Sequence, residues 1–136
     1  MMKDYAADKL RNVALISHGS AGKTSLTEAL LYTSGGTDRL GKVDEGNTVS
    51  DYDQDEIKRK ITINTSVIPC EWAGLKLNLL DTPGYADFIG DVLGALSVAD
   101  AALVMVCAVS GVEVNTGRMW HLAEERHLPR LLFINK

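Results

Sequence analysis

The sequence contains few of the residues that would assign it to a specialised class of protein. Two of its 136 residues are cysteine and three are proline, which excludes a disulfide-dense secreted scaffold and a proline-rich low-complexity chain. No apolar stretch is long enough to cross a bilayer, and the polar, charged start of the chain is unlike a signal peptide. These absences predict a cytoplasmic domain with no membrane partner.

The charge balance also lacks a basic excess. The chain has 14 Lys and Arg against 18 Asp and Glu, a net charge of −4, so no overall positive field attracts nucleic acid and no direct nucleic-acid site is evident. The length fits one domain. Cys70 and Cys107 each lie in an apolar, strand-like run, and we expect both to be buried as small hydrophobic residues.

The hydrophobic pattern predicts an α/β fold. Strands are expected at 11–16, 61–72, 75–80, 101–109 and 131–134, and helices at 23–32, 86–98 and 114–127. An Ala-Gly turn between the second and third strands predicts a hairpin. The polar stretch 37–60 is expected to be a functional or mobile loop. We therefore expect a mostly parallel sheet with one antiparallel strand and helices on both faces.

The segment Ser-His-Gly-Ser-Ala-Gly-Lys-Thr-Ser, residues 17–25, has the pattern of a phosphate-binding loop. It follows an apolar strand and opens a helix, although Ser17 stands in place of the first glycine of G-x-x-x-x-G-K-[ST]. Small residues let backbone N–H groups point at phosphates, and the helix N-terminus adds the positive end of its dipole. By itself, a chance Gly-Lys-Thr at a helix start is the alternative.

This pattern predicts individual ligands. Lys23 is expected to reach the β- and γ-phosphates, and the Thr24 hydroxyl is expected to ligate Mg²⁺. The predicted nucleotide-binding residues of the loop are His18, Gly19, Ser20, Ala21, Gly22, Lys23, Thr24 and Ser25.

A second motif, Asp81-Thr82-Pro83-Gly84, ends a predicted strand. An Asp in this position beside a phosphate loop can hold Mg²⁺ through water, and the Gly84 N–H can approach a γ-phosphate. The alternative is a plain turn, because these residues are favoured in turns. A third motif, Asn135-Lys136, follows the last predicted strand at the end of the chain.

Together these motifs resemble the G domain of translational GTPases, and the elongation factor G family most closely. The likeness covers residues 11–136 and rests on Gly22-Lys23-Thr24, Ile61-Thr62-Ile63, Asp81-Thr82-Pro83-Gly84, Asp87-Phe88 and Asn135-Lys136. It implies a Ras-like P-loop NTPase fold, GTP or GDP and Mg²⁺ as cofactors, and a ribosome partner bound through the intact multidomain protein.

The resemblance also implies roles for single residues. Thr62 would ligate Mg²⁺ in the GTP state and close the first switch loop, residues 37–62. Asn135 would hold the base and Lys136 would pack over it, as the first half of an Asn-Lys-x-Asp motif. Because the Asp is not reached, residues 1–136 are expected to be the N-terminal part of a GTP-binding domain that is truncated at its C-terminal end.

The chain departs from the family pattern at several positions. Ser17 replaces a glycine, Ser20 replaces an aspartate, and Tyr85 stands where the family has a histidine that positions the attacking water. A phenol has a pKa near ~10 against ~6.5 for imidazole, so Tyr85 cannot become the cation that a histidine can. We expect Tyr85, Lys23 and Gly84 to form the catalytic set, with the rate of hydrolysis left open.

Gly19 stands where the family has an apolar gating side chain, while Ile61, the second gating residue, is kept. We hypothesise that Gly19 makes room for the larger ring of Tyr85. The alternative is that Tyr85 only packs against a neighbour.

Two functions are predicted. The first is Mg²⁺-dependent GTP binding and hydrolysis by the switch domain of an elongation-factor-G-like translation factor acting on ribosomes. The alternative is a GTP-binding, weakly hydrolysing regulatory or ribosome-associated module, which Tyr85 and Ser20 favour. A third possibility, an ATP-using P-loop enzyme, has no counterpart to the base-holding pair Asn135-Lys136.

Overall fold

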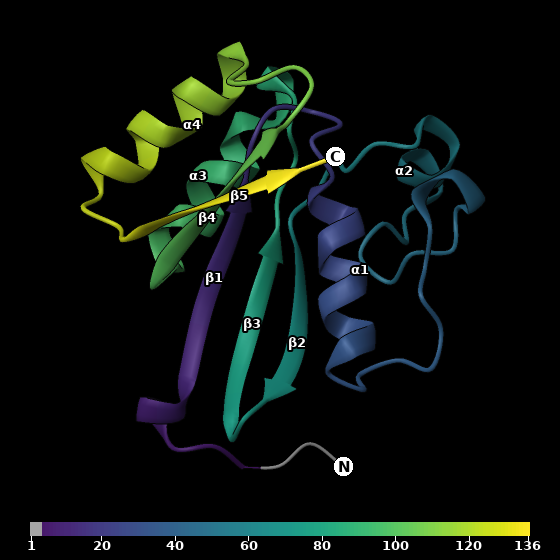
Figure 1. Cartoon of the computed structure of the whole chain (residues 1–136), viewed down its shortest axis with the longest axis vertical. Helices are drawn as coiled ribbons and strands as arrows, with labels where there is room; N and C mark the ends of the chain where they lie inside the picture. The colour runs from purple at the N-terminus through teal and green to yellow at the C-terminus, as the bar shows by residue number, and fades with distance from the viewer. Residues whose placement is uncertain (1–3) are drawn as a thin grey trace.

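A sheet of five strands forms the centre of the computed structural model, which describes residues 4–136 (Figure 1). The order in space is β2-β3-β1-β4-β5. Among the paired strands of residues 4–136, only β2 and β3 run antiparallel. The strands are β1 Leu10–Ile16, β2 Ser66–Trp72, β3 Leu75–Asp81, β4 Ala101–Cys107 and β5 Arg130–Asn135. The predicted α/β fold with a mostly parallel sheet and one antiparallel strand is confirmed.

Helices cover both faces of this sheet, as predicted. Helix α1 packs on β2 and β3, whereas α3 and α4 pack on β1 and β4 from the other side (Figure 1). A fourth helix, α2, lies in the loop that follows α1. The bounds are α1 Lys23–Thr33, α2 Gln54–Arg59, α3 Ile89–Val98 and α4 Val114–Glu125.

The core is divided between the two faces because side chains alternate along each strand. On β1, Ala14 and Ile16 join the cluster under α3 and α4, while Leu15 joins the cluster under α1. All three are fully buried. Cys70 and Cys107 are buried and unpaired with each other, as expected.

The register places the ends of the parallel strands at one edge of the sheet. Leu15 of β1 lies beside both Asp81 of β3 and Leu103 of β4, and Cys107 of β4 lies beside Asn135 of β5. In open α/β sheets, ligands bind outside the carboxyl ends of the strands. This edge therefore carries the loops in which a ligand site is expected.

The strand predicted at 61–72 begins later than expected, at Ser66. The backbone N–H groups of Ile63 and Asn64 donate to the Glu56 carboxylate, and that of Thr65 donates to Asp91. Side chains rather than a neighbouring strand satisfy these donors. The first part of the predicted strand was therefore wrong, and residues 61–65 belong to the loop.

The polar stretch 37–60 contains α2, which the apolar pattern did not predict. A capping box starts this helix: the Asp53 side chain accepts from the N–H of Asp55, and Glu56 accepts from the N–H of Asp53. Glu56 is nonetheless buried, with an exposed fraction of 1%. Its carboxylate accepts hydrogen bonds from residues 63 and 64, so this one side chain holds α2 and residues 63–64 together.

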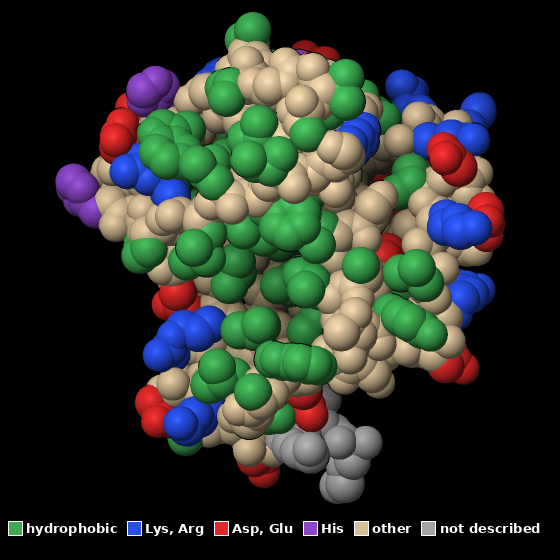
Figure 2. Space-filling model, viewed as in Figure 1, with side chains coloured by type: hydrophobic (Ala, Val, Ile, Leu, Met, Phe, Trp, Pro, Cys, Tyr) green, Lys and Arg blue, Asp and Glu red, His purple; other side chains and the backbone are tan. Residues whose placement is uncertain are grey.

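The distribution of charged and hydrophobic side chains on the surface is uneven. Figure 2 shows charged side chains gathered over α2 and its loop, and hydrophobic side chains across the middle of the same face. The exposed apolar residues of β5 are Leu131, Leu132, Phe133 and Ile134. Within residues 4–136, no helix is long and apolar enough to cross a membrane.

We predict that Glu56→Ala destabilises the loop. The substitution leaves the N–H groups of half-buried Ile63 and exposed Asn64 without their acceptor. Because water can reach these groups, the expected loss is at or below the lower end of the about 1–3 kcal/mol found at buried positions. Hydrogen exchange of these two amides is expected to become faster. Asp55→Ala is the matched control, since it removes the same charge from an exposed position of the same helix. Equal exchange in the two variants would contradict this account of Glu56.

Candidate functional site

The phosphate-binding loop predicted at residues 17–25 connects β1 to α1 at the carboxyl edge of the sheet. Its backbone turns through two left-handed positions, Ser20 (φ 63°) and Gly22 (φ 99°), and Gly22 is the N-cap of α1. A side chain at Gly22 would also collide with the amide of Asn135. Glycine is therefore required there for two independent reasons.

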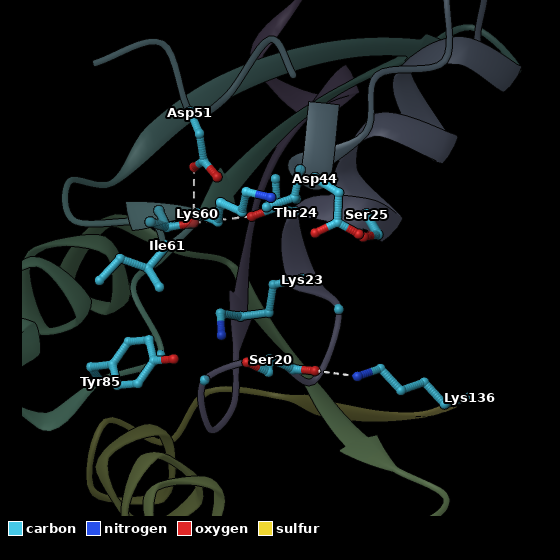
Figure 3. Close-up of a pocket in the computed structure, with 15 residues that line it drawn as sticks. Ser20, Lys23, Thr24, Ser25, Asp44, Asp51, Lys60, Ile61, Tyr85 and Lys136 are labelled. Carbon is cyan, nitrogen blue, oxygen red and sulfur yellow. Dashed lines mark hydrogen bonds between the residues drawn. The ribbon is translucent and has the colours of Figure 1, made fainter. Parts of the chain in front are cut away.

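A cavity of about 350 Å³ opens over this loop (Figure 3). That volume is in the range of ligand pockets. The predicted site residues that line it are Gly19, Ser20, Gly22, Lys23, Thr24, Ser25, Thr62, Gly84, Tyr85 and Lys136. Four predicted residues lie outside the lining: His18, Ala21, Asn135 and the fully buried Asp81.

The last two residues of the chain support the loop from behind. Asn135 donates its side-chain amide to the carbonyl of Ala21 at 3.0 Å, and Lys136 donates its ammonium to the carbonyl of Ser20 at 2.6 Å. The ring of His18 faces Glu113, with Nε2 3.7 Å from Oε1. These contacts place β5 against the phosphate loop and turn His18 away from the cavity.

Lys23 is buried at the floor of the cavity. Its Nζ donates to Ser17 Oγ and to the carbonyl of His18, both at 3.2 Å. Burial lowers the pKa of Lys23 to about 8, although Asp81 and Asp51 act in the opposite direction. A buried cation with nearby carboxylates and an open cavity above it is suited to an anionic ligand. Ser17, which departs from the family pattern, supplies one of the two acceptors.

Three oxygen-bearing side chains meet near Asp81. Thr24 Oγ1 and Thr62 Oγ1 are 3.0 Å apart, and Thr62 donates to Asp51 Oδ1 at 2.9 Å. Thr24 belongs to α1 and Thr62 to the loop, so this contact closes the loop over the cavity. Asp51 lies in the polar stretch 37–60, and no sequence pattern predicted a role for it.

Asp81 is fully buried, and neither carboxylate oxygen has a well-formed hydrogen bond within the described residues. Burial raises the pKa of Asp81 to about 6, while Lys23 and the hydroxyls of Thr24 and Ser50 lower it. Burial also raises the pKa of Asp51. Hydroxyl and carboxylate oxygens are the donors that Mg²⁺ takes in proteins, and the unsatisfied oxygens of Asp81 fit a hydrated cation above them.

Tyr85 packs directly on Gly19. A Cβ atom at Gly19 would lie 2.7 Å from Cζ of the Tyr85 ring, and Figure 3 shows the hydroxyl pointing into the cavity. A Cβ atom at Gly84 would lie 2.6 Å from both the backbone of Gly19 and Nζ of Lys23. The absence of a side chain at Gly19 and Gly84 is therefore what allows the Tyr85 turn to approach the phosphate loop.

The start of α4 contributes residues that the sequence analysis missed. Thr116 Oγ1 accepts from the backbone N–H of His18 at 3.1 Å, and Asn115 donates to the carbonyl of Gly84 at 3.1 Å. These two neighbours thus connect the phosphate loop to the Gly84–Tyr85 turn. The one sequence feature that could have indicated these residues is their place in the topology: α4 follows the carboxyl end of β4, at the edge of the sheet where ligands are expected.

A comparison with protein families assigns this geometry to a class. Residues 8–136 match the model of the elongation factor Tu GTP binding domain. The chain belongs to this family of translational GTPase domains, and the predicted resemblance is confirmed.

Curated relatives include two kinds of translation factor. The chain is 45% identical over 135 residues to ribosome-releasing factor 2, mitochondrial, of Lodderomyces elongisporus, covering 99% of this chain and 16% of that protein. It is 43% identical over 129 residues to elongation factor G of Thermotoga petrophila, covering 95% of this chain and 19% of that protein. The chain thus spans under a fifth of the length of these relatives.

Solved structures agree with the fold. A protein of Thermus thermophilus superposes with a TM-score of 0.89 at 48% identity, covering 91% of this chain and 19% of that one. Translation elongation factor SelB of Methanococcus maripaludis, solved with the GTP analogue GppNHp, gives a TM-score of 0.70 at 23% identity over 93% of this chain and 22% of that one. The second likeness supports the fold alone.

We predict that Thr116→Val weakens the phosphate loop. Thr116 is buried, with an exposed fraction of 3%, and valine keeps its shape but leaves the His18 N–H without an acceptor. The expected loss in the free energy of unfolding is about 1–3 kcal/mol, measured by urea denaturation. Thr116→Ser retains the hydroxyl and is the control. A similar stability for the valine and serine variants would refute the role assigned to this hydroxyl.

Proposed function

We propose that the chain is the Mg²⁺-dependent GTP-binding and GTP-hydrolysing switch domain of an elongation-factor-G-like translation factor that acts on ribosomes. The observation that carries the proposal is the hydrogen bond between Thr24 and Thr62. It joins the phosphate loop to a threonine of the loop at residues 37–62. A switch needs a segment that is held closed only while the γ-phosphate is present. Residues 1–136 would form the N-terminal part of the GTP-binding domain.

The phosphate groups would bind between Lys23 and the backbone N–H groups of residues 19–25. Gly84, packed on Gly19 and Lys23, would face the γ-phosphate. Lys136, which lines the cavity, and Asn135, which lies behind the phosphate loop, would hold the guanine base. Their contacts with Ala21 and Ser20 support this arrangement, because they place both residues beside the phosphate loop.

Thr24 and Thr62 would ligate Mg²⁺ through their hydroxyls, and Asp81 would hold it through water. A bound Mg²⁺ would supply positive charge that neutralises the charge developing on the phosphate groups. The part played by the chain is to bring two hydroxyls and two buried carboxylates, Asp81 and Asp51, to one place. Binding of the cation would also reduce the free-energy cost of burying carboxylate oxygens that have no partner.

A second candidate function is GTP binding with weak hydrolysis, in a regulatory or ribosome-associated module. The observation in its favour is Tyr85. Its hydroxyl faces the cavity and can hydrogen-bond an attacking water, but it cannot supply the positive charge of a protonated histidine. Phosphoryl transfer depends on water positioning together with charge stabilisation, so the chain would bind GTP well and depend on other groups for hydrolysis.

The cell compartment stays a prediction. Relatives of this chain include proteins named as mitochondrial as well as bacterial elongation factor G, so cytoplasm and mitochondrion are both compatible with the family.

The test of function is GTP turnover by the full-length protein with and without ribosomes. We expect turnover to need Mg²⁺, to be stimulated by ribosomes, and to be competed by GDP but not by ATP. Lys23→Met is expected to abolish nucleotide binding, because it removes the cation at the floor of the cavity. Binding of GTP without stimulated turnover would favour the second candidate. Competition by ATP at equal concentration would contradict both.

The Tyr85 site gives a separate prediction. Gly19→Val is expected to displace the Tyr85 ring, because even a Cβ at position 19 lies 2.7 Å from Cζ of the ring. Tyr85→His alone is expected to restore little activity, since it leaves the space at Gly19 unfilled. The measurements are a structure of each variant with GppNHp and its ribosome-stimulated turnover.

Gly117→Val serves as the control, because a Cβ at that helical glycine meets no atom within 4 Å. Unchanged placement of the Tyr85 ring in the Gly19→Val structure would count against the proposed relation between these two residues.

A further inference from the structure

Three lysines line the cavity: Lys23, Lys60 and Lys136. Two of them are engaged by the protein itself. Lys23 donates to Ser17 and His18, and Lys136 donates to Ser20. Lys60 has neither a hydrogen bond nor an ion pair from its side chain to any part of the chain that the structure describes. It is the cavity-lining cation whose ammonium is left without a protein partner in residues 4–136.

The backbone of Lys60 is in an unusual conformation. It caps the end of α2 with φ 55° and ψ 39°, and its N–H donates to the carbonyl of Glu56. This left-handed conformation is favoured for glycine at helix ends and disfavoured for residues with a Cβ. Residues held in strained conformations cluster at functional sites, and the side chain of Lys60 is the feature that glycine would lack here.

The position of Lys60 directs that side chain into the cavity. Figure 3 shows it extending toward Thr24 and Asp44. Lys60 directly precedes Ile61 and Thr62, and Thr62 bonds to Thr24. Closing the loop onto α1 therefore carries the Lys60 ammonium to the place where phosphate oxygens would lie.

Charge in this part of the cavity is otherwise negative. Asp44 and Asp51 line the same walls, and neither forms an ion pair with Lys60 in the described structure. An ammonium on a flexible stem, unpaired and beside carboxylates that it does not engage, is available to an anionic ligand. A triphosphate would supply that anion between Lys23 and Lys60.

We propose that Lys60 is a phosphate-binding residue that the closed loop delivers to the terminal phosphate of GTP. The inference rests on the proposed function and adds to it a residue that the phosphate-loop motif does not contain. Charge that develops on the oxygens of a transferred phosphoryl group can be stabilised by a cation supplied from a loop of the same chain. Lys60 thereby provides positive charge that Tyr85 cannot.

The experiment measures binding of GppNHp and of GDP to the full-length protein, by displacement of a fluorescent guanine nucleotide. Lys60→Gln is expected to weaken GppNHp binding about 10-fold, the size of one charge-assisted contact, and GDP binding less than about 2-fold. Lys60→Arg retains the charge and is expected to retain affinity. Lys58→Gln is the matched control, because it removes a cation from the neighbouring helix that does not line the cavity.

A further variant separates binding from folding. Lys60→Gly removes both the ammonium and the backbone strain, so it is expected to raise the midpoint of thermal unfolding while it weakens GppNHp binding like Lys60→Gln. Weaker binding in a more stable protein cannot result from misfolding.

Unchanged GppNHp affinity in Lys60→Gln overturns the inference while the proposed function stands. Equal weakening for GppNHp and GDP overturns the assignment to the terminal phosphate. Failure of the wild-type protein to bind either nucleotide overturns the proposed function, and the inference with it.

Discussion

The pairing of β1 between β3 and β4 is the constraint on which the site depends. Because both pairings are parallel, the chain leaves all three strands at the same edge, and Leu15 lies level with Asp81 and Leu103. The phosphate loop, the Asp81–Gly84 turn and the start of α4 therefore meet without any of them being long. A shift in the β1–β3 pairing would separate Lys23 from Asp81 and leave a buried charge alone, which is far more costly than a lost surface contact.

The loop above this edge is held mainly by carboxylates that accept backbone N–H groups. Glu28 is fully buried on α1 and accepts from Val49 at 2.7 Å, and Glu56 accepts from Ile63 at 2.9 Å. Hydrogen bonds to charged groups are stronger than neutral ones. These two anchor the loop but do not hold it over the cavity. Over the cavity, by contrast, the loop reaches α1 through the neutral contact between the hydroxyls of Thr62 and Thr24. Strong anchoring at two places thus coexists with one weak, releasable contact over the cavity.

The sheet, the large helices and the phosphate loop could be predicted because each has a local signal, either hydrophobic periodicity or a motif with fixed spacing. The start of β2 could not, since the partners of Ile63 and Asn64 are on a short helix that lacks an apolar stripe. Asn115 and Thr116 were missed for a related reason, because their partners are far away in sequence: Gly84 is 31 residues from Asn115, and His18 is 98 residues from Thr116. No sequence pattern indicates a role for Lys60. Its left-handed backbone and its unpaired ammonium, both visible only in the structure, identify it as a candidate ligand-binding residue.

The contact of Asn135 with Gly22 and Ala21 has a consequence for how the domain is made. The hydrogen-bonded partners Asn135 and Ala21 are 114 residues apart, and contacts of such separation form late because loop closure must come first. During synthesis the N-terminal segments emerge and begin to fold before β5 exists. A nascent chain therefore carries a phosphate loop that lacks the support on which its geometry rests. The phosphate loop can reach its final geometry only when β5 has joined the sheet, which ties that geometry to the synthesis of Asn135.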